Sequence, residues 1–359
     1  MTPTWIEAAI GGAAGLTLSV VLIRWVGPLG WMDRPDALRK KHARPTPRTA
    51  GMVLWLVLIA AQATGRMPIR LDAIDWAGVH IMAFVGMLDD RFDLRARYKA
   101  LGGLAVAIML AVHVAYSMGR AVDQVSFLGM SLPSHPVILV PVLLLWFWSL
   151  PQAYNLIDGI NGLSMGFAAL LLGVLGWNLK AQPTLLWGGL AAVLVLNFPK
   201  ARHFMGDCGA LLMGTFFAIL GVEAFALKDP NLLLWVFAYP TVDVLMVVSI
   251  RWWKGLPLGE ADRNHLHHWM MDRLNGRSWF ATPILLTIAG LPMLHATDLP
   301  GQEVISFLGL GLLVAVAMKA FKDRVTTRAA EVVTTQVRRE IPFVVSGSIR
   351  EVSGSHPKF

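Results

Sequence analysis

Four short polar segments interrupt an otherwise apolar chain, and they hold the side chains best suited to chemistry. They are residues 88–93, 155–162, 204–207 and 262–268, which are rich in aspartate, asparagine and histidine. Carboxylate and amide oxygens bind divalent cations, whereas histidine and arginine bind phosphate. On insertion scales, a charged side chain at the bilayer centre costs roughly 2.5 to 3.5 kcal/mol, so such groups need a functional reason. We expect the four segments to meet in one hydrated site at one membrane face.

The composition is typical of a membrane protein. Of 359 residues, 55% are hydrophobic and 15% are charged, and the mean hydropathy is +0.57. Soluble domains have about 25% charged residues and could not shield this much apolar surface. The net charge of +8 fits basic loops that face anionic membrane lipids or phosphate ligands, so we expect no nucleic acid partner. The single cysteine, Cys208, excludes an internal disulfide and a cysteine-based zinc site.

Apolar stretches long enough to cross a bilayer predict an all-α, polytopic fold of ten or eleven helices. The predicted spans lie near residues 7–28, 51–65, 74–88, 100–117, 136–154, 163–178, 184–198, 208–226, 232–250, 279–296 and 303–321. Residues 1–321 would form the transmembrane domain, and residues 322–359 a cytoplasmic tail. No cleavable leader is expected, because no Lys or Arg precedes the first apolar stretch.

The distribution of basic residues predicts the orientation. One set of alternate loops contains 17 Lys and Arg residues, whereas the opposite set contains 5. The richer set of loops faces the cytoplasm in membrane proteins, and all four polar segments fall on that side. We therefore predict that the site opens to the cytoplasm.

Asp89 and Asp90 end the third predicted span. Adjacent carboxylates repel each other unless water, basic groups or a divalent cation surrounds them. The pair could therefore bind a divalent cation, or it could form a solvated helix cap beside nearby arginines. Lys99, the next cytoplasmic cation, would by itself be only an anchor at the membrane face.

The segment 155–163 places irregular polar backbone between two spans. Such backbone survives at membrane depth only where protein buries it or where it lines a cavity. Gly159 and Gly162 permit close backbone approach, and Asn155 and Asn161 supply donors and acceptors for a ligand. A tight turn would use the same residue types, so both interpretations stay open here.

Asp207 opens the eighth span. As a helix N-cap it would contribute about 1 kcal/mol, which is a complete explanation for a lone aspartate. Its place on the same face as the other segments also fits a magnesium site. Asn155 would be the second oxygen ligand, since Mg²⁺ takes few protein ligands and keeps its waters and phosphates.

His265, His267 and His268 lie in a basic loop with Arg263. The cluster lacks the cysteine or glutamate spacing of zinc sites, so a diphosphate is the better ligand. The loop 33–48, which ends at Arg48, is also basic and fits either phosphate or lipid headgroups.

Three further polar residues lie inside apolar stretches. We expect His80 and His113 to be hydrogen-bonded packing residues. Asp243 is a functional candidate, because an ionisable side chain within a span needs a partner or a ligand.

Taken in this order, the polar segments resemble the polyprenyl-phosphate N-acetylaminosugar-1-phosphate transferases, the family of MraY, WecA and TagO. The resemblance covers residues 33–268, and its last motif is similar to that of the WecA-like branch. The residues that carry it are Asp33-x-Pro35, Arg39-Lys40-x-His42, Leu88-Asp89-Asp90, Lys99, 155–163, Asn197, 204–207, Pro240-x-x-Asp243 and 262–268.

The resemblance implies transfer of a sugar 1-phosphate from a UDP-sugar to undecaprenyl phosphate, with release of UMP and with Mg²⁺ or Mn²⁺ as cofactor. It implies metal ligation by Asn155 and Asp207. The catalytic roles that it implies fall on Asp89, Asp90, Lys99, Asp158, His265, His267 and His268. The substrate contacts that it implies fall on Lys41, His42, Gly159, Ile160, Asn161, Asn197, Phe204, Asp243 and Arg263, with Phe204 stacked on uracil.

The sequence departs from the family pattern at three places. Pro199-Lys200-Ala201 stands where Pro-Ala is usual, Cys208-Gly209-Ala210 replaces Ser-Gly-Ser, and Ala50-Gly51 replaces Gly-Gly. None of these changes removes an expected ligand, but the identity of the N-acetylaminosugar stays open.

The leading hypothesis is an enzyme of the bacterial cytoplasmic membrane that begins the synthesis of O-antigen or another envelope polysaccharide, with GlcNAc as the common sugar. Two other classes are open. A lipid-phosphate phosphatase would need no nucleotide, and a secondary transporter would place charged groups at mid-helix. The sequence leaves the oligomeric state open, with a homodimer as one possible form.

Overall fold

A computed structural model describes residues 4–33, 45–257 and 263–340 of the chain, with side chains described as far as residue 326. Lys41 and His42, two of the expected substrate contacts, lie outside the described residues.

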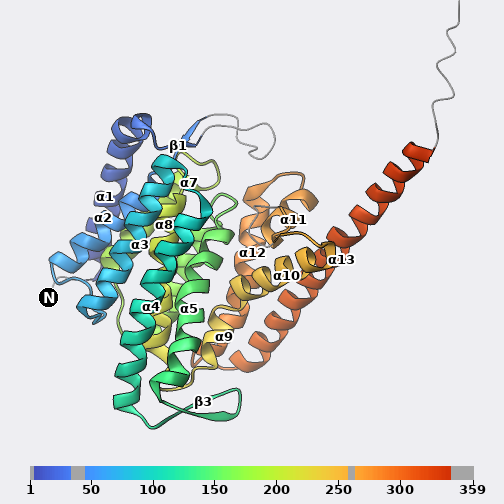
Figure 1. Cartoon of the computed structure of the whole chain (residues 1–359). Coiled ribbons are helices and arrows are strands. Elements are labelled where there is room, and N and C mark those ends of the chain that lie inside the picture. Colours follow the sequence, from blue (N-terminus) through green and yellow to red (C-terminus); the bar gives the residue numbers. More distant parts are fainter. Residues whose placement is uncertain (1–3, 34–44, 258–262, 341–359) are drawn as a thin grey trace, which may run out of the picture.

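Helices make up nearly all of the described fold (Figure 1). The α-helices are α1 (Thr4–Val21), α2 (Ala50–Ala63), α3 (Ala73–Phe92), α4 (Ala96–Ala121), α5 (Pro136–Ile157), α6 (Leu163–Asn178), α7 (Thr184–Asn197), α8 (Gly206–Phe225), α9 (Leu232–Val236), α10 (Ala238–Lys254), α11 (Leu266–Arg273), α12 (Ser278–Met293) and α13 (Gln302–Glu340). A π-helical turn, η1 (Leu22–Val26), extends α1, and two 3-10 turns are η2 (Gly27–Leu29) and η3 (Leu294–Ala296).

Each of the eleven predicted spans falls on a helix, and the all-α, polytopic membrane fold is confirmed. Within the described part of the chain, six helices are long and apolar enough to cross a membrane, and α2, α6 and α7 are shorter apolar helices. The ninth predicted span is broken at Phe237 into α9 and α10. The last span continues as one helix to Glu340, so the segment that we assigned to the tail begins inside α13.

The α8 helix is the centre of the bundle. In its most apolar stretch of 18 residues, 94% of the residues are buried, and the helix packs against α2, α3 and α5. Glycines allow this close approach: a Cβ on Gly51 would lie 2.1 Å from the backbone nitrogen of Gly209, and one on Gly86 would lie 2.3 Å from the Asp207 carbonyl oxygen. Small residues at helix contacts are the usual way to bring membrane helices together. The packing therefore sets the start of α8 directly against α3.

The two ends of the bundle carry different short hairpins (Figure 1). At one end, β1 (Met32–Asp33) pairs with β2 (Thr46–Pro47), next to the point where α3 ends. At the other end, β3 (Gln124–Phe127) pairs with β4 (Met130–Pro133). The apolar spans do not predict the β3–β4 hairpin, which lies between the fourth and the fifth of them.

Candidate active site

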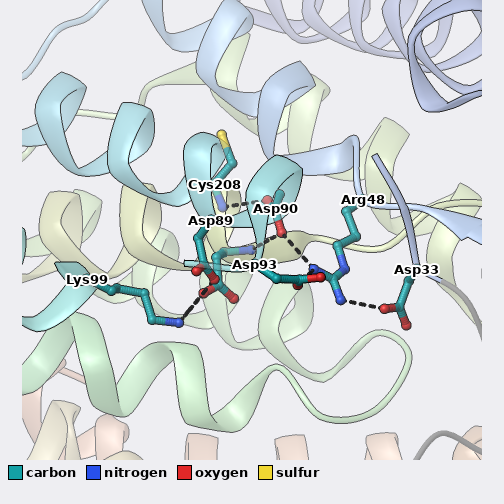
Figure 2. A network of polar contacts seen from close by, with 8 residues as sticks. Asp33, Arg48, Asp89, Asp90, Asp93, Lys99 and Cys208 are labelled. Atoms are coloured by element: carbon teal, nitrogen blue, oxygen red, sulfur yellow. Dashed lines mark hydrogen bonds and ion pairs between the residues drawn. The ribbon is translucent and has the colours of Figure 1, made fainter. Parts of the chain in front are cut away.

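The carboxylate pair at the end of α3 faces in two directions (Figure 2). A carboxylate oxygen of Asp89 lies 3.3 Å from the Lys99 ammonium in α4, and the same ammonium is paired with the Asp207 carboxylate in α8. The side chains of Asp89, Lys99 and Asp207 expose only 12%, 21% and 22% of their surfaces. Three helices therefore bring two carboxylates and one cation to a single point.

Asp90 turns away from that point and caps α8. Its Oδ1 accepts the backbone N–H of Asp207 and its Oδ2 accepts that of Cys208, each at 2.9 Å. Only 1% of the Asp90 side chain is exposed. The solvated helix cap that we considered for this pair is thus excluded. Asp207 is not the N-cap of its own helix either, because Met205 occupies that position.

Arg48 lies on the far side of Asp90 from Lys99 (Figure 2). Its guanidinium lies 2.5 Å from Asp33, 3.4 Å from Asp93 and 3.9 Å from Asp90, measured to one oxygen of each carboxylate. The sequence placed Arg48 in a basic loop that would hold phosphate or lipid headgroups. In the structure, its charge is instead shared among three acidic neighbours.

Backbone hydrogen bonds fix the segment that precedes Asp207. The Phe204 N–H donates to the Pro47 carbonyl at 2.7 Å, and the Phe204 carbonyl accepts from the Ala50 N–H at 3.0 Å. The Gly51 N–H then donates to the Met205 carbonyl at 3.0 Å. The half-buried Phe204 ring is thereby anchored beside the start of α2.

Asp158 ends α5 and joins the charged group. Its carboxylate accepts a 2.5 Å hydrogen bond from the Ser164 hydroxyl, while the Tyr154 hydroxyl donates to the Ser164 carbonyl at 2.6 Å. Burial, together with the nearby Asp207 charge, raises the pKa of Asp158 to about 6. Asn155 lies about one helical turn earlier in α5 and is half-buried, so it belongs to the same end of that helix.

Asn197 ties two loops together at the base of the site. Its amide oxygen accepts from the Gly162 N–H at 2.6 Å, and its amide nitrogen donates to the His203 carbonyl at 2.8 Å. Asn161 adds a second link, because its side chain donates to the Pro199 carbonyl at 3.0 Å. The turn at 155–163 is therefore held against the segment that leads to Asp207.

The histidine motif is anchored by Asp243. This fully buried aspartate in α10 lies 2.7 Å from His265 Nδ1, and it accepts the Leu266 N–H at 2.7 Å. Asp243 therefore caps α11 and orients a histidine, and it does not open to a ligand. A transporter would also have a charged residue within a span. Here the contact between Asp243 and His265 explains that residue.

His267 connects the histidine motif to the turn at 155–163. A Cβ on Gly159 would lie 1.9 Å from His267 Nε2, so the ring packs directly on that glycine. The His267 ring is 1% exposed, and neither nitrogen has a hydrogen-bond partner among the described residues. Burial, with the nearby His268 and His265, holds the pKa of His267 well below its usual range. The imidazole is therefore neutral at neutral pH in the ligand-free protein.

His268 and Arg263 lie on the outer side of the same motif. The centroids of the His267 and His268 rings are 4.2 Å apart, and burial, reinforced by Arg263, lowers the pKa of His268 to about 4. Arg263 is more exposed and lies 3.5 Å from Asp272 in α11. Arg324 in α13 lies 2.9 Å from the other oxygen of Asp272, so α13 packs on α11 through charged contacts.

The donor set around Lys99 fits a divalent cation. Mg²⁺ prefers carboxylate oxygens, and Asp207 and Asp89 already gather around one positive charge. The pairing of Asp207 with Asn155 as metal ligands stays a prediction.

A second metal-capable group lies elsewhere. Among the described residues, the grouping of Asp and His whose ligand atoms all lie within 4.8 Å of one another is Asp72, Asp75 and His113. It lies at the start of α3, about 21 Å along the helix axis from Asp89, so it is not part of the site described above. His113 lies 2.5 Å from Asp72, and His80 accepts from Trp55 at 2.9 Å, so both histidines are hydrogen-bonded as expected.

The four polar segments thus come together, although only some of their residues lie at the charged centre. The residues that converge on the charged centre or pack beside it are Asp89, Lys99, Asp158, Gly159, Asp207 and His267. The residues whose polar atoms are engaged in holding neighbouring elements are Asp90, Asn161, Asn197, Asp243 and His265. Ile160 is half-buried and packs on the apolar core. Sequence reasoning missed the role of Arg48, because charge alone does not reveal which carboxylates surround it.

The model of glycosyl transferase family 4 matches residues 74–225, which run from α3 to the end of α8. A protein of Bacillus subtilis (strain 168) named probable undecaprenyl-phosphate N-acetylglucosaminyl 1-phosphate transferase is 28% identical over 275 residues. That match covers 71% of this chain and 74% of the relative. These matches support the polyprenyl-phosphate sugar-1-phosphate transferase family for this chain.

Other relatives of the chain carry similar names. The undecaprenyl-phosphate alpha-N-acetylglucosaminyl 1-phosphate transferase of Escherichia coli (strain K12) is 28% identical over 263 residues, covering 68% of this chain and 70% of the relative. The protein of the same name from Yersinia pestis is 27% identical over 317 residues, covering 82% of each. These matches favour a transferase over the phosphatase and the transporter that the sequence left open. The matched family region contains Asp89, Lys99, Asp158 and Asp207, all of which lie at the charged centre.

Proposed function

We propose that this transferase moves an N-acetylaminosugar 1-phosphate from a UDP-sugar to undecaprenyl phosphate and releases UMP. The observation that carries the proposal is the convergence of Asp89, Lys99 and Asp207 from three helices. Phosphoryl transfer demands positioning and charge neutralisation more than covalent chemistry by the protein. The partly buried group of Asp89, Lys99 and Asp207, which combines negative and positive charge, meets that demand.

The lipid phosphate attacks the UDP-sugar directly, with no phospho-enzyme intermediate. An oxygen of the lipid phosphate forms a bond to the β-phosphorus of the UDP-sugar, and the bond from that phosphorus to the bridging oxygen breaks. The bridging oxygen and its electron pair leave with UMP. Asp89 orients the lipid phosphate and accepts its proton when the phosphate arrives as a monoanion. Lys99 compensates negative charge between the two substrates.

Several neighbours would hold the diphosphate and the nucleotide. His267 and His268, as neutral imidazoles, can donate hydrogen bonds to diphosphate oxygens, and Arg263 adds a positive charge. Phe204 would stack on uracil, with the 159–161 turn at the edge of the base. Lys41 and His42 stay candidate phosphate contacts, as the sequence predicts.

Mg²⁺ is the proposed cofactor, with Mn²⁺ as a substitute. Asp207 and Asn155 would hold the ion, and when bound it would neutralise the diphosphate and help UMP to leave. The carboxylates present at the centre suit such an ion.

The proposed setting is the bacterial cytoplasmic membrane, with the site open to the cytoplasm. The excess of basic residues in the loops at this end supports that orientation. A UDP-sugar would reach the site from water, and the isoprenoid chain would stay in the lipid. The names of the relatives make GlcNAc the first sugar to test, for O-antigen or another envelope polysaccharide.

The proposal is tested with purified protein, undecaprenyl phosphate and a panel of UDP-sugars, by measuring released UMP. We expect release that needs both substrates. We expect Asp207→Asn and Asp89→Asn to lower the rate at least about 100-fold while the protein still folds. Asp93→Asn, which alters a 90%-exposed carboxylate at the same end of α3, is the matched control. Turnover at the wild-type rate in either test variant would refute the site assignment.

A further inference from the structure

We propose that Asp90 is a positioning residue. Together with Arg48, it forms an external N-cap that holds the first turn of α8, and with it the Asp207 carboxylate, in place. Its neighbour Asp89 faces the reacting groups, so two adjacent aspartates have separate tasks. The catalytic consequence rests on the proposed function, whereas the capping itself does not.

The start of α8 has no cap of its own. The N-cap position is held by Met205, which provides no side-chain hydrogen bond. The first amides of a helix lack intrahelical partners and carry a partial positive charge. Asp90 supplies two of the missing acceptors from α3, one oxygen for each of the Asp207 and Cys208 amides. Both carboxylate oxygens are thereby engaged, and the side chain is almost completely buried.

The surrounding backbone is shaped for this contact. Gly206 has φ of +68°, a region that favours glycine, and a Cβ there would lie 2.5 Å from Asp90 Oδ2. Gly86, one turn before Asp90 on α3, would with a Cβ collide with the Asp207 carbonyl oxygen at 2.3 Å. Two glycines, one on each helix, therefore leave the space through which Asp90 reaches the amides.

Arg48 compensates the charge that this arrangement buries. Its guanidinium lies 3.9 Å from Asp90 and is held by Asp33 at 2.5 Å and Asp93 at 3.4 Å. Its backbone N–H donates to the Trp31 carbonyl at 2.7 Å, so Arg48 is fixed at the base of the β1–β2 hairpin. Figure 2 shows the resulting sequence of contacts from Asp33 through Arg48 and Asp90 to Cys208.

The separation of tasks follows from helix geometry. Successive residues of an α-helix point about 100° apart, so the two adjacent side chains leave α3 in different directions. Asp89 points to Lys99, and Asp90 points to the α8 amides. Displacing Asp90 would shift the first turn of α8 and move the Asp207 carboxylate from its place beside Lys99.

Hydrogen exchange of the ligand-free protein tests the capping directly. In Asp90→Asn, one amide of the α8 first turn loses its acceptor, because the Asn side chain offers a single accepting oxygen. We expect the amides of residues 207–208 to exchange about tenfold faster or more than in the wild type. Asp93→Asn removes a carboxylate from the same Arg48 and suits the left-handed backbone at that position, so exchange at 207–208 should not change. Equal exchange in Asp90→Asn and Asp93→Asn would overturn the proposal.

The wild-type protein provides a second test that needs no variant. The α4 helix also lacks a side-chain cap, because its N-cap residue, Arg95, makes no side-chain hydrogen bond to the first-turn amides in the described structure. We expect the amides at 207–208 to exchange at least about tenfold more slowly than those at 96–97 of α4, relative to their intrinsic rates. Equal protection would contradict the external cap even if Asp90→Asn failed to fold.

The effect on Asp207 has its own measurement. Because Asp207 is a proposed ligand of Mg²⁺, the Mg²⁺ concentration for half-maximal UMP release should rise about tenfold in Asp90→Asn, and high Mg²⁺ should restore part of the rate. A simple loss of folded molecules would lower the rate without changing that concentration. An unchanged concentration would refute the positioning of Asp207 by Asp90. If the wild type releases no UMP at all, the proposed function fails, while the exchange result still decides the cap.

Discussion

The imidazole of His267 packs against the backbone of Gly159, leaving no room for a side chain at position 159. A Cβ there would lie 1.9 Å from Nε2 of the ring. This contact joins two motifs that are more than one hundred residues apart in the sequence, and it brings the histidine cluster to the turn that contains Asp158. Gly159 therefore determines how closely the histidine cluster approaches the turn that contains Asp158.

Gly159→Ala should disable the enzyme while leaving the fold intact. The added methyl group would push His267 from its place, and a displacement of about 1 Å at a reacting centre costs roughly 100-fold in rate. UMP release by purified protein measures the effect. Gly311→Ala in α13 is the matched control, because a Cβ at that glycine meets no atom within 4 Å. Comparable activity in the two variants would show that the His267–Gly159 contact does not matter for turnover.

Asp158→Asn should stabilise the protein at neutral pH. The pKa of Asp158, raised to about 6, exceeds its ordinary value of 3.8, so the folded state holds the proton more tightly than the unfolded state. The contribution of this group to stability is therefore full below about pH 4 and falls as the pH rises toward 6. Asn keeps an accepting oxygen for Ser164 and cannot ionise.

Thermal unfolding of both proteins between pH 4 and pH 8 measures this effect. The variant should unfold at the same temperature as the wild type near pH 4 and at a higher temperature above pH 6, by up to about 3 kcal/mol in free energy of unfolding. UMP release should fall in the variant, because the ionised carboxylate near Asp207 is lost. A difference in unfolding temperature that does not change with pH would contradict the assigned pKa.

Lys99→Met should leave two neighbouring carboxylates without their shared cation. Charged hydrogen bonds of this kind contribute about 2 kcal/mol, so we expect a lower unfolding temperature and a loss of UMP release of at least about 100-fold. Lys228→Met, an exposed lysine near the β3–β4 end, is the control for loss of a positive charge. Equal activity in both variants would show that Lys99 is not needed for UMP release.

Removal of divalent ions with a chelator should stop UMP release, and Mg²⁺ or Mn²⁺ should restore it. In Asp207→Asn, any remaining rate should need at least about tenfold more Mg²⁺ than in the wild type. Asp72→Asn alters the other metal-capable grouping, at the opposite end of α3, and should leave the Mg²⁺ dependence unchanged. A higher Mg²⁺ requirement in Asp72→Asn, with no change in Asp207→Asn, would indicate that the metal binds at the other end of α3.

The elements that could be predicted are those that length and hydropathy decide. A stretch such as 208–226 is apolar except for Glu223 near its end and becomes α8, because a helix satisfies its backbone inside lipid. The break at Phe237 was missed although the sequence carries its signal, because Pro240 has no N–H to bond the Val236 carbonyl in a continuous helix. The β3–β4 hairpin was missed because its strands have only four residues each, the shortest length at which alternating apolar and polar residues indicate a strand.

The candidate site was predicted as a set of residues but not as a set of contacts. The sequence grouped Asp89 with Asp90, and it could not show that one faces Lys99 and the other the α8 amides. Asn197 looked like a ligand-binding amide, yet both ends of its side chain hold backbone groups. These partners lie far away in the chain, and only the packing of α3, α7 and α8 determines them.

The fate of the β-phosphorus distinguishes sugar-1-phosphate transfer from other cleavages of a UDP-sugar. Purified protein would be given undecaprenyl phosphate and UDP-GlcNAc labelled at its β-phosphorus, and the products would be separated into lipid and water-soluble fractions. We expect the label to appear in a lipid-linked pyrophosphate, with one UMP released for each label transferred and none released without the acceptor lipid. Label that appears instead in free phosphate or in UDP would contradict sugar-1-phosphate transfer by this protein.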